Sequence, residues 1–275
     1  METKEEKPGP GTAAGVVDQA CGPSAHVMAD SARTAPSTGS RPPPNYFVTQ
    51  RHALRPAMPE VKLEKPHLGK ATLRRVSVAD RPGGLREPYE VLTSDESGLA
   101  IMFARSLKTA IYGSVWYALE VQREPGGYFT IRRDEQGLER RLAVKRMPWR
   151  KINGLSHKED PIHEIAALKK LGDPGHPHVL KLVEALDDGL TVYVLTPFVD
   201  GGEMFNWVET GASQEDVVKP LFRQLVEGMR YVHSKGICHV DMSLENALVD
   251  SARENAFIID FGMSIAMPSD SEGRR

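Results

Sequence analysis

The sequence predicts an α+β fold that follows a long N-terminal arm, and three features of its 275 residues carry this prediction. Nine of the 20 prolines lie in the first 60 residues, where no helical or strand period is sustained. Apolar and aromatic runs typical of strands recur between residues 110 and 195. An apolar stripe with helical spacing follows at residues 218–232.

Composition narrows the class of protein. With 40% hydrophobic residues, 26% charged residues and a formal net charge of −2, the chain is neither a polycation that coats nucleic acid nor an acidic disordered protein. Two cysteines support no disulfide framework, and the polar N-terminus does not resemble a signal peptide. We therefore expect a cytoplasmic or nuclear protein with no membrane span and no nucleic-acid partner.

Residues 1–97 are predicted to be a disordered, basic arm rich in Pro and Gly, because such a segment buries too little apolar surface to offset its ordering entropy. Between Arg33 and Arg86, eleven Lys and Arg face three acidic residues. This local positive charge favours a solvated tail over a site for an acidic partner or membrane surface.

The elements after residue 98 are predicted in order. Runs at 110–121 and 142–147 indicate antiparallel strands, and Pro161 begins a helix that Gly172 ends. Two further strands, 179–185 and 190–195, flank the turn signal Asp187-Asp188-Gly189.

The second half of the chain begins with one long helix. Its stripe runs from Val218 to Val232, and Gly236 ends it. Short strands at 247–249 and 256–259 carry polar residues at their ends, where chemistry usually lies.

Four polar sites follow one another in a specific order. Lys145 lies on a strand, Glu164 lies on the next helix, and two loops carry His239-Val240-Asp241 with Asn246 and Asp260-Phe261-Gly262. Each site alone is more often structural, but together LAVK, HVDMSLEN and DFG resemble the protein kinase family. The resemblance implies a bilobal fold: a β-rich N-lobe at about 98–195, a hinge at 196–203 and a partial helical C-lobe at 204–275.

The resemblance also implies ATP and Mg²⁺ as cofactors and a protein substrate. Phosphoryl transfer depends chiefly on positioning and on electrostatic stabilisation of the phosphates. Lys145 would clamp the phosphates with Glu164 as its partner, Asn246 and Asp260 would ligate Mg²⁺, and Asp241 would act as general base.

Further nucleotide contacts follow from the same resemblance. The phosphate-covering stretch would contribute Lys108, Ala110 and Gly113; the adenine pocket would contain Val115, Ala143, Thr196, Pro197, Val199 and Leu248; and Glu203 would bond the ribose. A stacked apolar column would contain Leu168, Leu182, His239 and Phe261.

The sequence departs from the family in ways that leave alternatives open. Lys108 and Ala110 replace two glycines, Val240 replaces an arginine, and only 13 residues follow Gly262. We therefore expect an apolar face on the long helix that a partner covers. A nucleotide-binding pseudokinase or scaffold, an inactive fragment of a longer kinase and a small-molecule phosphotransferase are the other interpretations.

Overall fold

Eight strands form one sheet in the first part of the computed structural model, which describes residues 63–154, 161–210 and 214–267. They are β1 (Gly69–Ala79), β2 (Arg86–Ser94), β3 (Ala100–Ala110), β4 (Gly113–Arg123), β5 (Phe129–Ile131), β6 (Arg141–Pro148), β7 (Glu184–Asp187) and β8 (Thr191–Pro197). The predicted antiparallel pairs 110–121 with 142–147 and 179–185 with 190–195 are present as β4–β6 and β7–β8.

The strand pairings close on themselves twice. One circuit, called the barrel below, runs β1–β2–β3–β4–β6–β8–β7 and returns to β1. Its interior is an apolar cluster to which all seven strands contribute. A second circuit runs β1–β2–β3–β4–β5 and returns to β1 around another cluster. Strands β2, β3 and β4 therefore bury both faces: Ile101 lies in the first cluster and its neighbour Met102 in the second.

The structure corrects the extent of the predicted arm. Residues 69–79 and 86–94 are β1 and β2, although both fall within the stretch 1–97 that was predicted to be disordered. The strand pattern of β1 is weak because the strand has as many polar as apolar residues and contributes one buried side chain to each of two cores, Ala71 and Val78. The remainder of the predicted arm, residues 1–62, lies outside the described residues.

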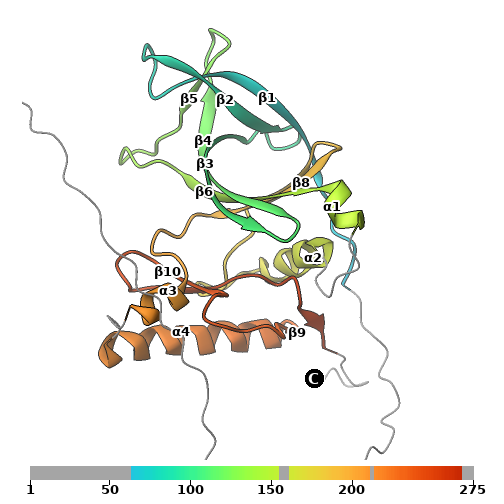
Figure 1. Ribbon diagram of the computed structural model, residues 1–275, viewed down its shortest axis with the longest axis vertical. Helices are drawn as coiled ribbons and strands as arrows, with labels where there is room; N and C mark the ends of the chain where they lie inside the picture. Colours follow the sequence, from blue (N-terminus) through green and yellow to red (C-terminus); the bar gives the residue numbers. More distant parts are fainter. Residues whose placement is uncertain (1–62, 155–160, 211–213, 268–275) are drawn as a thin grey trace, which may run out of the picture. The chain divides into compact units, whose positions relative to one another are not determined.

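Helix α2 (Pro161–Leu171) crosses beneath the sheet, after the short helix α1 (Trp149–Gly154) (Figure 1). Its buried face carries Ile165, Leu168 and Leu171. The helix ends at Leu171 and Gly172 follows it, as predicted, with its N–H donating the last helical bond to the Leu168 carbonyl at 3.0 Å.

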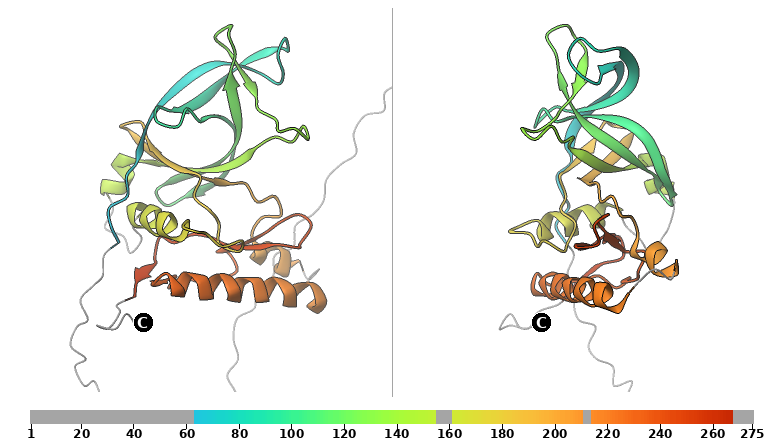
Figure 2. Two further views of the ribbon diagram at one scale, coloured as in Figure 1. Left: turned by 180° about the vertical axis from the view of Figure 1, so that it is seen from behind. Right: turned by 90° about the vertical axis from the view of Figure 1, so that its left-hand side faces the viewer.

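Helix α4 (Glu215–Ser234) lies below α2 (Figures 1 and 2). The other elements of this part are α3 (Met204–Glu209), β9 (Ile237–Cys238), β10 (Ala247–Val249), β11 (Ala256–Ile258) and β12 (Ile265–Ala266). Helix α4 confirms the predicted stripe, since Leu221, Leu225 and Val232 are buried, and Gly236 follows it with a φ of 75°.

One predicted strand is shorter than expected. Residues 179–185 form a strand only from Glu184 onward. Val179 makes a single bridge to Ile258, and the Leu180 N–H donates to the Ile258 carbonyl at 3.0 Å. This apolar stretch therefore joins the β10–β11 hairpin instead of extending β7.

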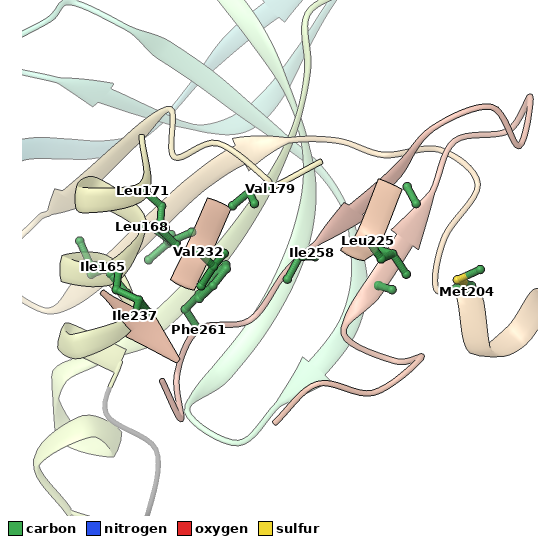
Figure 3. Close-up of a cluster of buried hydrophobic side chains, with 14 of the residues drawn as sticks. Ile165, Leu168, Leu171, Val179, Met204, Leu225, Val232, Ile237, Ile258 and Phe261 are labelled. Atoms are coloured by element: carbon green, nitrogen blue, oxygen red, sulfur yellow. The ribbon is translucent and has the colours of Figure 1, made fainter. Parts of the chain in front are cut away.

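A third apolar cluster joins α2, α4 and the short strands (Figure 3). It includes Ile165 and Leu168 from α2, Val232 from α4, and Phe261. On α4, Phe222 is 61% exposed and Val226 is 44% exposed, so part of the apolar stripe is exposed; that a partner covers it stays a prediction. No helix within these described ranges is both long enough and apolar enough to cross a membrane.

Candidate active site

Lys145 and Glu164 form an ion pair between β6 and α2. The Lys145 Nζ lies 2.7 Å from the Glu164 Oε2, and the two side chains are 19% and 7% exposed. The alternation of β6 explains the placement, because Leu142 and Val144 point into the barrel core and Lys145 lies on the opposite face. A pair this buried is stable only while both charges are present.

The loop after β9 is fixed to the segment that follows β11. His239 is fully buried, its Nε2 lies 2.8 Å from the Ile259 carbonyl, and its ring centroid lies 4.8 Å from that of Phe261. The Ile259 N–H donates to the Asn246 carbonyl at 3.0 Å. The residues around Asp241, Asn246 and Asp260 are therefore held together.

Asp241 and Asn246 are in direct contact. The Asn246 Nδ2 donates to the Asp241 carbonyl at 2.8 Å and to its Oδ2 at 3.1 Å. This bond turns the amide nitrogen of Asn246 toward Asp241 and leaves the amide oxygen on the other side. The Asp241 side chain remains exposed and accessible to a substrate.

Two non-glycine residues of the site have a left-handed backbone conformation. Val240 has a φ of 68° and Asp260 a φ of 60°. A β-branched residue in this region is a strained exception, with a cost of about 1–3 kcal/mol. Such strain is typical of functional loops, and here it occurs next to the predicted base Asp241 and at the predicted metal ligand Asp260.

Two hydrogen bonds hold the predicted hinge against β6. The Phe198 N–H donates to the Arg141 carbonyl at 3.1 Å, and the Thr196 Oγ1 donates to the Ala143 carbonyl at 3.3 Å. Because successive groups of an extended chain point in opposite directions, the Pro197 carbonyl points away from β6. The predicted adenine contacts Val115, Ala143 and Leu248 are all partly exposed.

The β3–β4 hairpin corresponds to the predicted phosphate-covering stretch. A Cβ atom at Gly113 would lie 1.8 Å from the Arg146 carbonyl oxygen, so β6 packing alone requires glycine there. Ala110 ends β3 and is partly exposed. The Lys108 Nζ lies 2.5 Å from the Glu203 Oε1, so two residues predicted to bind nucleotide contact each other.

Tyr112 was not among the predicted site residues. It lies at the tip of the β3–β4 hairpin, is 2% exposed and belongs to the apolar cluster that contains Ile165 and Phe261. The sequence signal that could have indicated Tyr112 is an aromatic residue in a turn that would otherwise be exposed. The predicted column is consistent with the same cluster, which includes Leu168 and Phe261 and packs against Leu182.

The side-chain oxygen atoms of Asp260 and Asn246 are suited to bind the cation of Mg-ATP. Within the described residues the Asp260 carboxylate accepts one hydrogen bond, from the Gly262 N–H at 3.3 Å, and retains free oxygen lone pairs. Carboxylate and amide oxygens are hard ligands of the kind that Mg²⁺ prefers. No cluster of three or more His, Cys, Asp or Glu occurs in the described part of the chain, so an ion beside Asp260 and Asn246 would need phosphate or water oxygens as further ligands.

The comparisons with known proteins agree with this geometry. The family described as protein kinase domain matches residues 128–274, which is more than half of the chain. The chain belongs to the protein kinase family.

Three similar proteins are plant kinases. CBL-interacting serine/threonine-protein kinase 15 of Arabidopsis thaliana is 37% identical over 45% of this chain and 28% of its own length. CBL-interacting protein kinase 17 of Oryza sativa subsp. japonica is 33% identical over 60% of this chain and 32% of its own length. SNF1-related protein kinase catalytic subunit alpha KIN12 of Arabidopsis thaliana is 35% identical over 46% of this chain and 25% of its own length. The chain thus covers a quarter to a third of these relatives.

Proposed function

We propose that this protein transfers a phosphoryl group from Mg-ATP to Ser or Thr hydroxyls of protein substrates. The observation that carries the proposal is the 2.7 Å ion pair between Lys145 and Glu164. It is supported by the apolar cluster that α2 shares with Phe261, next to Asp260. The pair and the carboxylate loops thus border one packed core.

The phosphates would be held by Lys145, whose long side chain Glu164 keeps in place. Mg-ATP supplies the phosphoryl group and the cation that neutralises it. Asp260 and Asn246 would provide oxygen ligands to the cation, and each has an oxygen directed away from the contacts described above.

Asp241 would accept the proton of the substrate hydroxyl or orient that hydroxyl as general base. The hydrogen bond from Asn246 fixes its carboxylate at 3.1 Å while leaving the second oxygen available. Asp241 therefore would act next to the cation ligand Asn246.

Adenine would lie between the partly exposed side chains of Val115 and Ala143 on one side and Leu248 on the other. The Pro197 carbonyl and the Val199 N–H would bond its polar edge, with Thr196 deeper in the cleft. Glu203 would bond the ribose.

The Ser/Thr class rests on the loop after Asp241 and on the names of the relatives. Glu245 matches the Ser/Thr-type ending of this loop. In the structure, a hydrogen bond from the Ser243 side chain lowers the pKa of Glu245, so its carboxylate stays charged at neutral pH. Val240 replaces the arginine that would receive a phosphate from the activation segment, so we do not expect switching by that modification.

A transfer assay tests the proposal. Full-length chain is incubated with radiolabelled ATP, Mg²⁺ and casein, beside the variants Asp241→Asn and Lys145→Ala. We expect label on Ser or Thr that requires Mg²⁺ and that both substitutions remove. Nucleotide binding without any transfer would favour the scaffold interpretation, and label that persists in Asp241→Asn would refute the assigned base.

A further inference from the structure

We propose that Lys108 lowers the selectivity of the nucleotide site for ribose hydroxyls by occupying Glu203. This inference rests on the proposed ATP-binding function. It concerns a residue that replaces glycine in the phosphate-covering stretch, and it assigns that residue to the sugar end of the cleft instead of the phosphate end.

The position of the ion pair supports the assignment. Lys108 lies opposite Val115 in the β3–β4 register, and Glu203 forms a bridge with Leu248. Val115 and Leu248 are predicted to contact adenine from opposite sides. The ion pair therefore joins the two sides of the proposed adenine site, next to the position expected for the ribose.

The hairpin that carries Lys108 is anchored at its tip. Tyr112 is 2% exposed in the cluster shared with α2, and Gly113 lies against the Arg146 carbonyl. Lifting the hairpin would expose the Tyr112 ring and open this contact. Lys108 therefore stays within reach of Glu203 without help from a ligand.

The strength of the ion pair sets the expected effect. Lys108 is 56% exposed and Glu203 24% exposed, so solvent screens the pair and a nucleotide can displace it. A carboxylate free of Lys108 would accept ribose hydroxyls with a charge-assisted bond, which is typically worth about tenfold or more in affinity. In the native chain, competition from Lys108 reduces this gain.

Calorimetric titration of the full chain with the Mg complexes of ATP and 2′,3′-dideoxy-ATP tests the proposal. We expect the native chain to prefer ATP by at most about threefold and Lys108→Ala by about tenfold. Glu203→Ala should abolish the preference with or without Lys108. The control Arg105→Ala removes an exposed cation from the same strand, beside Tyr117 instead of Glu203, and should behave as the native chain.

Three outcomes would overturn the inference. Equal preference in the native chain and Lys108→Ala would refute it while leaving ATP binding intact. A loss of affinity for both nucleotides in Lys108→Ala at an unchanged ratio would show that Lys108 contacts phosphate. No binding of either nucleotide to any variant would refute the proposed function itself, and this inference with it.

Discussion

Strands β1–β4 and the segment from β6 to β12 belong to one structure but differ in how they are held and in what they carry. The first segment precedes residue 128, where the match to the kinase family begins, and its four strands take part in both closed strand circuits. The second contains Lys145, Glu164 and both carboxylate loops. The early strands thus complete the closure of the sheet, whereas Lys145, Glu164 and the carboxylate loops all belong to the second segment.

The two segments are joined at Arg146, next to Lys145. Its Nη1 lies 2.8 Å from the Glu90 Oε2 of β2, and its guanidinium lies 4.5 Å from the centroid of the Phe103 ring on β3. On β4, buried Glu120 accepts bonds from Arg132 at 2.5 Å and Arg140 at 2.8 Å. The early strands therefore support the strand that carries Lys145.

The largest expected effect is a loss of transfer rate with no loss of stability. Asp241→Asn should lower the transfer rate by about 10²–10⁴-fold, the usual contribution of a positioned base, with an unchanged melting temperature because Asp241 is exposed. Initial rates and thermal melting of the same preparation measure both quantities. A melting temperature that falls with the rate would show that the loop has a structural role.

The second prediction asks whether the early strands are integral to the fold. Leu92 on β2 and Leu195 on β8 are both fully buried in the same cluster. Leu92→Ala and Leu195→Ala should each lower the free energy of unfolding by about 2–5 kcal/mol. Denaturant titration measures this, and a negligible cost for Leu92→Ala alone would show that the barrel is not closed as described.

The sequence predicted the second segment well and the first poorly, for physical reasons. An amphipathic period marks α4, which buries one face, whereas α2 is buried on most sides and was predicted from the residues at its two ends. Strand β3 buries both faces around Ile101 and Met102, so it has no alternation there, and β1 has as many polar as apolar residues. The ion pair of Lys145 with Glu164 was expected from the order of the motifs, whereas that of Lys108 with Glu203 depends on spatial proximity alone.

The third prediction concerns the ion pair between β6 and α2, within the second segment. Glu164→Ala leaves the largely buried Lys145 charge without its 2.7 Å partner and should cost about 2–3 kcal/mol of stability, somewhat less than a fully buried pair. It should also weaken ATP binding. The matched control Glu227→Gln on the exposed face of α4 should change neither quantity, and an unaffected melting temperature in Glu164→Ala would contradict the role of the pair.

The smallest effect concerns pH. Burial, with a contribution from His178, lowers the pKa of His176, whose ring stacks on Tyr231 at 5.2 Å. The unfolded chain then binds more protons below about pH 6.5, so stability falls as the pH drops through that value. His176→Asn should reduce the fall in melting temperature between pH 7 and pH 5.5. An identical pH profile in both proteins would refute the assignment.

The central claim is that the second segment, together with the β3–β4 hairpin of the first, forms an Mg-ATP site. Thermal melting of the full chain with and without Mg-ATP tests it most directly, because a ligand that binds only the folded state raises the midpoint. We expect a rise that requires Mg²⁺ and is absent in Lys145→Ala and Asp260→Ala. A cooperative melt that is indifferent to Mg-ATP would contradict the claim.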